Sequence, residues 1–297
     1  MPLDQPLVSV LMTAYNRQAF IAEAIESVLS STYTNFEFII VDDCSSDHTL
    51  QISKSYIGKD SRIRVYQNEK NLGDYPNRNR AAWYAKGKYL KYVDSDDMIY
   101  PHALALFVAG METFPDAAVG IMSQADQDNK TFPYQLSPAE AYRYHFYQRG
   151  LFDTGPSALI FKTESFNKMG GFSGKRFVGD TEINLKLAAQ WPVVILAPSL
   201  IFWREHAGQE IVAGMNSTGY LEANLPLLTD ELNKKGNPLS EAEKSDIIGY
   251  HRKMSAREII KIALVKRKPR HAIRLYRKLS LQCKDLVQAI LFKKKKY

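Results

Sequence analysis

The chain has 297 residues, of which 45% are hydrophobic and 24% charged, as expected for a globular protein with one large domain and an appendage. No stretch approaches the roughly 18 consecutive apolar residues of a membrane-spanning helix, and two distant cysteines, Cys44 and Cys283, exclude a disulfide framework and favour a reducing cytosol. The formal net charge of +7 belongs to the C-terminal tail, which needs its own explanation.

The first hundred residues alternate between short apolar runs and helical patterns. Strands are predicted at residues 7–13, 36–41, 62–66 and 89–93, and helices at residues 17–31, 47–57 and 75–86. This alternation predicts an α/β fold with a mostly parallel, Rossmann-like sheet and helices on both faces. In such sheets ligands bind beyond the carboxyl ends of the strands.

From residue 101 to about residue 203 the pattern becomes mixed. Strands are predicted at residues 117–123, 157–161, 192–197 and 200–203, and helices at 139–148 and 181–190. After residue 219 only helical patterns remain, including a helix that runs from about Arg270 and carries apolar residues as far as Ile290. We therefore expect a body, residues 1–218, and an α-helical basic C-terminal extension, residues 219–297.

Three carboxylates occupy four positions directly after the strand predicted at 89–93, in Asp94-Ser95-Asp96-Asp97. Carboxylates so close together repel one another. Mg²⁺ or Mn²⁺ removes that conflict, because these ions prefer oxygen ligands and share them with the phosphates of substrates. The stretch therefore indicates metal-assisted phosphate chemistry, with a solvated acidic turn that caps the next helix as the alternative.

Several segments together resemble the family-2 glycosyltransferases. They are residues 8–17 (VSVLMTAYNR), residues 38–47 (FIIVDDCSSD), and Asn71-Leu72-Gly73 followed by Arg78-Asn79. The resemblance is strong over residues 7–100 and moderate to about residue 210. It implies a GT-A type fold, in which residues 1–218 form a nucleotide-sugar-binding and catalytic domain, and transfer of a sugar with inversion.

The resemblance places the donor-binding residues at strand ends. Asp43 is the first choice to accept a hydrogen bond from the nucleotide base, with Asp42 beside it, and a turn or helix cap is the alternative. Arg78 can offer a forked guanidinium to the base or the diphosphate, with Arg80 as its rival. The residues that could hold base, ribose or phosphate after the first strand are Thr13, Tyr15 and Arg17.

The same resemblance gives the acidic cluster separate roles. Asp94, with Ser95, would contact the ribose or metal-bound water, and Asp96 would bind Mn²⁺ or Mg²⁺ between the two phosphates. His206, in Trp203-Arg204-Glu205-His206-Ala207-Gly208, resembles a later element in which a histidine approaches the metal or the diphosphate; a surface position is the alternative. The metal would offset the charge that builds on the departing nucleoside diphosphate.

An inverting transfer also needs a base that accepts the proton of the attacking hydroxyl. Gly170-Gly171-Phe172, followed by residues 178–185, looks like the acceptor-side motif of the family. Asp180 matches the position of the base, and Glu182 is the reserve. Capping of the helix that begins here is the alternative for both.

Three positions depart from the usual pattern of the family. Cys44 stands where a glycine is usual, Asn77 where an alanine is usual, and Gly179 where the first of two acidic residues is usual. The Gln-x-x-Arg-Trp signature of processive synthases is also absent from the sequence. This absence argues for the addition of one or a few sugars.

The leading hypothesis is a metal-dependent, inverting, hexosyltransferase-like enzyme of cell-surface polysaccharide or glycolipid synthesis. Its partners would be a nucleotide-diphospho-sugar donor and a saccharide or lipid-linked saccharide acceptor. Nucleotidyl transfer is an alternative, although the chain lacks the glycine- and arginine-rich phosphate loop typical of it. The other alternative is a catalytically inactive carbohydrate- or membrane-binding module.

The tail has a charge pattern of its own. Residues 251–297 contain 16 Lys and Arg against 2 Asp and Glu, out of 39 and 32 in the chain, so the first 250 residues carry 23 basic and 30 acidic residues. Apolar residues at helical spacing among these cations, ending in Lys293–Lys296, fit an anionic membrane surface. No nucleic-acid-binding motif accompanies the charge. We expect a cytoplasmic protein, either peripheral on the inner face of the cell membrane or with these helices packed on the domain.

Overall fold

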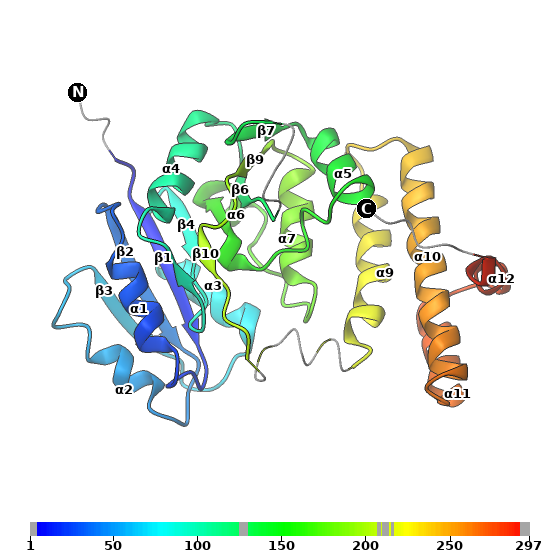
Figure 1. Ribbon diagram of the computed structural model, residues 1–297, viewed down its shortest axis with the longest axis horizontal. Coiled ribbons are helices and arrows are strands. Elements are labelled where there is room, and N and C mark those ends of the chain that lie inside the picture. Colours follow the sequence, from blue (N-terminus) through cyan, green and yellow to red (C-terminus); the bar gives the residue numbers. More distant parts are fainter. Residues whose placement is uncertain (1–4, 125–129, 207–208, 210–213, 215–216, 292–297) are drawn as a thin grey trace.

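The computed structural model describes residues 5–124, 130–206, 209, 214 and 217–291. Its centre is a sheet of eight strands (Figure 1). In spatial order they are β3 (Ile63–Gln67), β2 (Phe36–Asp42), β1 (Val8–Ala14), β4 (Tyr89–Tyr92), β8 (Leu159–Lys162), β6 (Val119–Met122), β9 (Val193–Leu196) and β7 (Tyr134–Leu136).

The sheet is parallel over the half that carries the first strands. β3, β2, β1 and β4 run parallel, as do β6 and β9, whereas β8 and β7 run antiparallel to their neighbours. Ala14 at the end of β1 pairs with Asp42 at the end of β2. The polar residues that follow these strands therefore share one edge, and the predicted mostly parallel α/β fold is confirmed.

Alternate residues of the central strands enter two separate cores, as the period of a strand requires. In β1, Val10 and Met12 enter one core and Leu11 enters the other. The core with Val10 is covered by α1 (Ile21–Leu29), α2 (Thr49–Lys54) and α4 (Ala103–Thr113). The core with Leu11 is covered by α3 (Asp74–Tyr84), α5 (Pro138–Tyr147), α6 (Thr163–Lys168) and α7 (Gly179–Ala188).

A second, two-stranded sheet lies beside the acidic turn. It pairs β5 (Met98–Ile99) with β10 (Ile201–Phe202) in antiparallel fashion. β5 begins directly after Asp97, and β10 leads to Arg204 and His206. This small sheet therefore brings the acidic turn close to the segment of Arg204 and His206.

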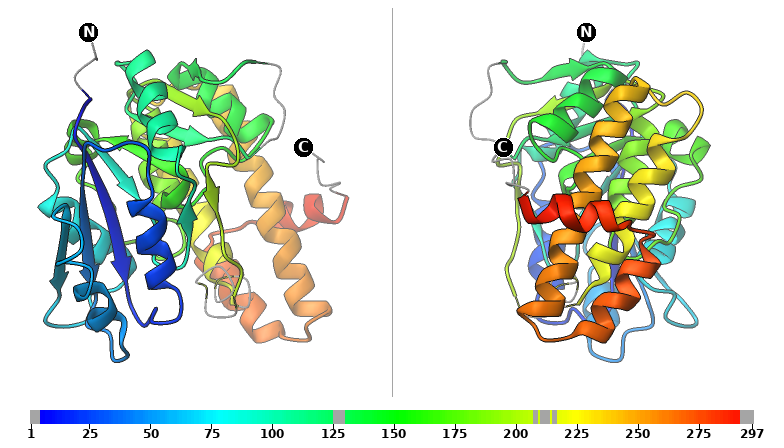
Figure 2. Two further views of the ribbon diagram at one scale, coloured as in Figure 1. Left: turned by 60° about the vertical axis from the view of Figure 1, so that its left-hand side comes forward. Right: turned by 90° about the vertical axis from the view of Figure 1, so that its right-hand side faces the viewer.

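The C-terminal region consists of helices in the described residues. They are α9 (Gly219–Leu232), α10 (Glu241–Leu264), α11 (Pro269–Lys278) and α12 (Cys283–Leu291), and they stack beside the sheet domain (Figure 2). Leu228 of α9 joins the core of the sheet domain, while Leu225 joins a separate cluster with Ile259 and Leu275. The boundary at residue 218 stays a prediction. No helix within the described ranges has both the length and the apolar character needed to cross a bilayer.

Two predicted helices were wrong in extent. The predicted helix from about residue 270 is two helices, because Ser280 adopts a positive φ of 48° and the Asp285 carboxylate accepts a hydrogen bond from Gln282 N at 2.7 Å, at the start of α12. The helix predicted from Arg17 begins only at Ile21. The Arg17 N–H is bonded to Thr49 Oγ1 at 2.7 Å, in a turn before the helix.

Candidate active site

Ser157 supports the acidic turn that follows β4. The Asp94 N–H donates to Ser157 Oγ at 3.0 Å, and the Asp97 N–H closes the turn on Asp94 O at 2.9 Å. Asp97 is 4% exposed. Burial, together with the charges of Asp94 and Asp96, raises the pKa of Asp97 to about 7. Asp97 therefore points inward and supports the turn.

Asp96 points to the other side of the turn. Its Oδ2 accepts a hydrogen bond from Arg17 Nε at 3.0 Å and lies 2.9 Å from His206 Nε2, which is 110 residues away in sequence. The His206 ring packs against Phe20, with ring centroids 4.6 Å apart. Segments that follow β1, β4 and β10 thus meet at one carboxylate oxygen.

Asp96 and His206 are the two predicted metal ligands. Mg²⁺ and Mn²⁺ in phosphate-handling sites are often bound by one or two protein groups, with substrate phosphates and water supplying the rest. In the described ranges, no group of three or more His, Cys, Asp or Glu side chains could hold a metal ion. The two residues fit a metal that shares the phosphates of a bound donor, and that assignment stays a prediction.

Arg78 is buried between two carboxylates. Its Nε donates to Asp74 at 2.8 Å and its Nη1 to Asp94 at 2.6 Å. Burial alone would lower the pKa of Arg78, but Asp74 and Asp94 outweigh it and raise that pKa well above its usual range. Arg78 thus fixes Asp94 to α3, and its contact with the base or diphosphate stays a prediction. Its rival, Arg80, is exposed on the same helix.

Asp43 holds the loop that carries the Asn71-Leu72-Gly73 element. Its carboxylate accepts from Leu72 N and Gly73 N, both at 2.9 Å, and from Asn68 Nδ2 at 2.7 Å. A carboxylate has about four acceptor positions. Asp43 therefore retains capacity for about one further donor, such as an N–H of a nucleotide base.

Asp42 lies beneath Asp43 at the end of β2 and has no exposed surface. Its Oδ1 accepts from Ser45 N at 2.9 Å, whereas Oδ2 has no hydrogen-bond partner in the described part of the chain. A buried carboxylate oxygen without a donor is costly. Asp42 is therefore either paired by a ligand or kept at a cost.

Two of the departures from the family pattern have local causes. Cys44 adopts a φ of 62°, the left-handed region that favours glycine, which explains why glycine is usual there. Asn77 accepts from Asn68 at 2.8 Å and donates to Val41 O at 3.2 Å. Asn68 in turn donates to Asp43, so Asn77 is part of the network that holds this loop.

The three donor-side residues predicted around the end of the first strand differ in exposure. Tyr15 is 46% exposed, and its carbonyl accepts from Arg17 Nη1 at 3.2 Å. Thr13 is partly buried near the end of β1, and Ser95 is buried in the acidic turn. The Arg17 side chain reaches the acidic turn, where its Nε donates to Asp96 Oδ2 at 3.0 Å. Their ligand contacts stay predictions.

Asp180, the predicted base, is the second residue of α7. Its Oδ1 accepts hydrogen bonds from the Tyr75 hydroxyl and from Thr181 N, both at 3.1 Å. Burial raises the pKa of Asp180 to about 6, although these donors and Arg78 act in the opposite direction. A carboxylate with this pKa is charged at neutral pH and can still accept a proton.

Glu182, the reserve, has a different environment. It is 3% exposed, accepts from Ser173, and lies 3.2 Å from Lys175 and 3.0 Å from Lys186. Burial alone would raise its pKa, but Ser173 and the two lysines lower it. Glu182 is therefore held in its charged form by its own neighbours, which makes it a poorer proton acceptor than Asp180.

The sequence analysis missed Tyr75 and Lys91. The sequence pattern indicated only that Tyr75 belongs to a predicted helix, and no motif linked Tyr75 to Asp180. Lys91 interrupts an apolar strand, which could have been a signal. It is fully buried, and its ammonium donates to Tyr92 O at 2.8 Å and to Ser157 O. Burial lowers the pKa of Lys91 to about 7.

The fold is that of a GT-A type glycosyltransferase. The model of the family described as "Glycosyl transferase family 2" matches residues 9–170, more than half of the chain. The chain therefore belongs to glycosyl transferase family 2, as the sequence resemblance indicated.

Two curated relatives show how far the likeness extends. The glycosyltransferase GlyG of Streptococcus pneumoniae is 26% identical over 68% of this chain and 72% of its own length. The putative teichuronic acid biosynthesis glycosyltransferase TuaG of Bacillus subtilis is 43% identical, over 31% of this chain and 37% of its own length. Several such matches span only 36–39% of the relative, so the likeness is concentrated in one part of those proteins.

Solved structures share the fold. S. aureus TarS 1–349 superposes with a TM-score of 0.69 at 22% identity, over 95% of this chain and 80% of that chain. The mannosyltransferase PcManGT from Pyrobaculum calidifontis, in complex with GDP-Man and Mn²⁺, gives a TM-score of 0.65 at 15% identity, over 98% of this chain and 87% of that chain.

Proposed function

We propose that this chain transfers a glycosyl group, with inversion, from a nucleotide-diphospho-sugar to a hydroxyl acceptor. The observation that carries the proposal is the arrangement around α3. Arg78 of this helix holds Asp94, on the donor side, while Tyr75 of the same helix donates to Asp180 on α7. Asp180 would accept the proton of the acceptor hydroxyl, since a base with a pKa near 6 suits that task at neutral pH.

A nucleotide-diphospho-sugar is the donor class that the site suits. The remaining acceptor capacity of Asp43, which lies over the buried Asp42, could accept from an N–H group of a base. TarS has been solved with UDP-GlcNAc, and PcManGT with GDP-Man. Because these two donors differ in base and sugar, the proposal stops at the donor class.

We also propose that Mn²⁺ or Mg²⁺ binds between Asp96 and His206. Such a metal, when bound, would offset negative charge on the diphosphate. Arg17, which donates to Asp96, adds a fixed positive charge on the same side of the turn. Asp96→Ala should abolish metal-dependent transfer and weaken Mn²⁺ binding measured by calorimetry with UDP present. Full retained activity would contradict this assignment.

The base assignment is tested by comparing Asp180→Asn with Glu182→Gln. Asp180→Asn should keep the donor dissociation constant within about twofold and lower kcat by about 10²–10⁴-fold, the usual effect of losing a general base. Glu182→Gln should lower the melting temperature clearly and kcat only slightly, because Lys175 and Lys186 lose the carboxylate with which they form ion pairs. The reverse pattern would make Glu182 the base. A wild-type chain that binds donors but transfers nothing would indicate an inactive binding module.

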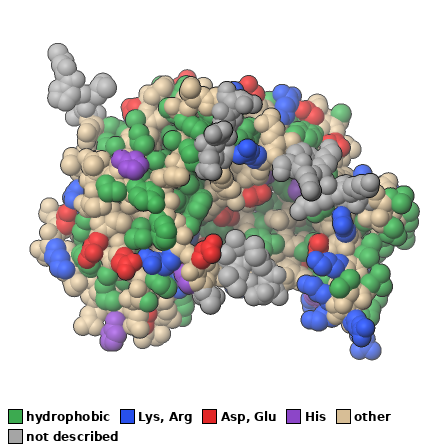
Figure 3. Space-filling view, in the orientation of Figure 1, with side chains coloured by type: hydrophobic (Ala, Val, Ile, Leu, Met, Phe, Trp, Pro, Cys, Tyr) green, Lys and Arg blue, Asp and Glu red, His purple; other side chains and the backbone are tan. Residues whose placement is uncertain are grey.

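We further propose that the C-terminal helices rest on an anionic membrane surface, beside a saccharide or lipid-linked saccharide acceptor of polysaccharide or glycolipid synthesis. Three apolar side chains of α12 point outward: Val287, Ile290 and Leu291 are 63%, 73% and 84% exposed. They lie at positions i, i+3 and i+4 of one helix face, called here the α12 strip. Figure 3 shows Lys and Arg side chains gathered at the lower right, near hydrophobic side chains at the right-hand edge.

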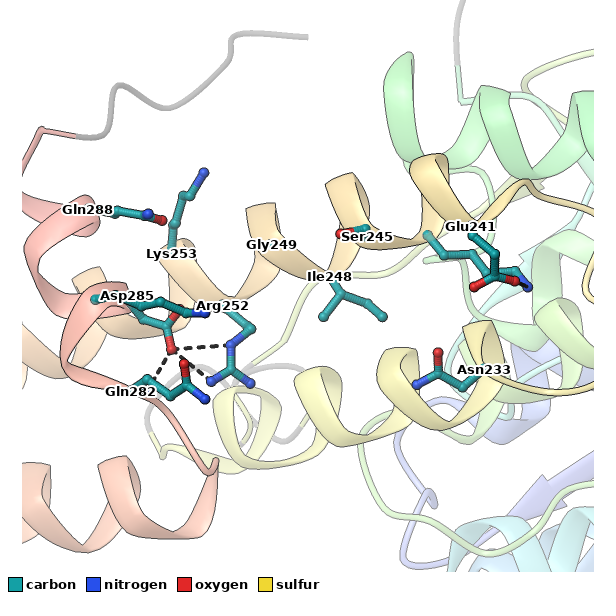
Figure 4. A pocket seen from close by; sticks show the side chains of 12 residues that line it. Asn233, Glu241, Ser245, Ile248, Gly249, Arg252, Lys253, Gln282, Asp285 and Gln288 are labelled. Atoms are coloured by element: carbon teal, nitrogen blue, oxygen red, sulfur yellow. Dashed lines mark hydrogen bonds and ion pairs between the residues drawn. The ribbon is translucent and has the colours of Figure 1, made fainter.

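The α12 strip is presented by a helix that is firmly attached. Asp285 is buried and accepts from two nitrogens of Arg252, at 3.2 and 2.7 Å, which joins α12 to α10. These bonds line one end of a hollow of about 480 Å³ between α9, α10 and α12 (Figure 4). Because Ala289 on the opposite face of α12 is buried, the apolar strip is left to the outside. Lys293–Lys296, which would add charge here, lie outside the described residues.

A further inference from the structure

The hydroxyl of Tyr75 contacts Asp180 twice. It donates to Asp180 Oδ1 at 3.1 Å and accepts from Asp180 N at 3.3 Å, so one phenol engages both the carboxylate and the backbone of this residue. Tyr75 is 8% exposed, and its ring packs against Phe172 with centroids 5.2 Å apart. The phenol therefore has little freedom to move away.

Gly179 makes this contact possible. A Cβ atom at residue 179 would lie 2.7 Å from Cε2 and Cζ of the Tyr75 ring, closer than real side chains approach. The acidic side chain that is usual at this position could not coexist with the ring. The departure at residue 179 and the tyrosine at residue 75 are thus two parts of one arrangement.

We propose that Tyr75 is a positioning residue for Asp180, and that Gly179 provides the space it needs. This inference rests on the proposed role of Asp180 as the base. A general base must keep its carboxylate within hydrogen-bond reach of the proton that it accepts, and a neighbouring donor that fixes its orientation serves that end. Since Arg78 on the same helix holds Asp94, α3 would set the base relative to the donor site.

The surroundings of Asp180 predict how the loss of the phenol would act. The charge of Arg78 lowers the pKa of Asp180. Asp153 lies beyond Thr181 and accepts a hydrogen bond from the Thr181 hydroxyl at 3.2 Å. The charge of Glu182 is balanced by its ion pairs with Lys175 and Lys186. The Tyr75 hydroxyl favours the charged carboxylate, against the effect of burial. Removal of that hydroxyl should therefore raise the pH at which Asp180 becomes active.

Tyr75→Phe tests the proposal, with steady-state transfer measured from pH 5 to 9. We expect kcat to fall about 10- to 100-fold, as for a lost hydrogen bond to a charged group, while KM for the donor stays within about twofold. The acid limb of the kcat profile should move to higher pH. Tyr142→Phe is the matched control, because Tyr142 donates to Leu185 O on the same helix at 2.9 Å. It should lower the melting temperature without moving the pH profile.

The proposal fails if Tyr75→Phe keeps the wild-type kcat and acid limb, or changes only as Tyr142→Phe does. Gly179→Ala is a second route, since its Cβ would displace the ring, and it should shift the acid limb in the same direction even if Tyr75→Phe does not fold. Asp180→Asn distinguishes the positioning role of Tyr75 from the base role of Asp180. If Asp180→Asn abolishes transfer while Tyr75→Phe behaves as wild type, only the positioning role is wrong. If Asp180→Asn is active, the assignment of Asp180 as the base is itself wrong.

Discussion

Replacement of Ile290 and Leu291 by asparagine should release the protein from anionic membranes. Full burial of a Leu or Ile side chain contributes about 2 kcal/mol. Scaled by their exposed fractions of 73% and 84%, the two side chains together would contribute about 3 kcal/mol to membrane binding. That corresponds to about a hundredfold in the partition coefficient.

Cosedimentation with vesicles of phosphatidylglycerol and phosphatidylcholine measures this coefficient directly. Ile57→Asn is the control. Ile57 is exposed as well, at 46%, but it follows α2, which lies at the opposite end of the molecule from α12 in Figure 1. Binding that is unchanged in the double variant, or lost equally in the control, would refute the role of the α12 strip. Donor binding should be unaffected in both variants.

Point substitutions are better here than truncation. Removal of the chain from Pro269 onward would delete Leu275 and Ala289, which pack in one cluster with Ile259 and Ile262 of α10. That cut would expose a new apolar surface on α10. A truncated protein could then bind vesicles for the wrong reason, so its retention would not report on α12.

Lys91→Met should stabilise the fold in a pH-dependent way. The pKa of Lys91 is about 7 in the folded protein and about 10.4 in the unfolded chain. The free-energy cost of burying the charged ammonium is therefore complete below pH 7 and is relieved as the pH rises toward about 10.4. In urea titrations, the advantage of the variant should shrink by about 3 kcal/mol from pH 7 to 9.5, and an equal advantage at both pH values would contradict this. Cys44→Val should lower the free energy of unfolding by about 1 kcal/mol, because a β-branched side chain tolerates the positive φ of residue 44 less well than cysteine does, while Cys44→Gly should be within about 1 kcal/mol of wild type; equal loss in both variants would show that the thiol itself matters. The kcat/KM of wild type should rise with pH through an apparent pKa near 6 as Asp180 loses its proton; a profile that is flat from pH 5 to 7 would argue against this base.

The parallel half of the fold was predictable because its signals are local. β1, β2 and β4 are largely apolar and send alternate residues into the two cores, whereas the edge strand β3 also carries exposed residues such as Arg64. The positions of Asp43 and Asp96 followed from the same logic, since the carboxyl ends of parallel strands share an edge. The convergence of Asp96 with His206 needed the family resemblance, because β10 is only two residues long.

Other features could not be read from the sequence, because they depend on contacts between distant residues. The bond between Tyr75 and Asp180 spans 105 positions. The carboxylate of Asp43 was expected to face a ligand, yet three of its about four acceptor positions are used by Asn68, Leu72 and Gly73. The break at Ser280 depends on a single left-handed residue inside an otherwise regular apolar pattern. Local periodicity carries no information on any of these.

The pairing of β5 with β10 joins the acidic turn to the segment that carries His206. Asp96 precedes β5 and His206 follows β10, and the two strands are two residues long, with Phe202 44% exposed. Arg204 joins the two segments directly, since its Nε donates to Asp96 O at 3.1 Å. Ile99 and Ile201 of the pair are 3% and 6% exposed and belong to the same core as Val10 of β1. Any substitution that loosens this core should therefore disturb the contact between Asp96 and His206 as well as the sheet.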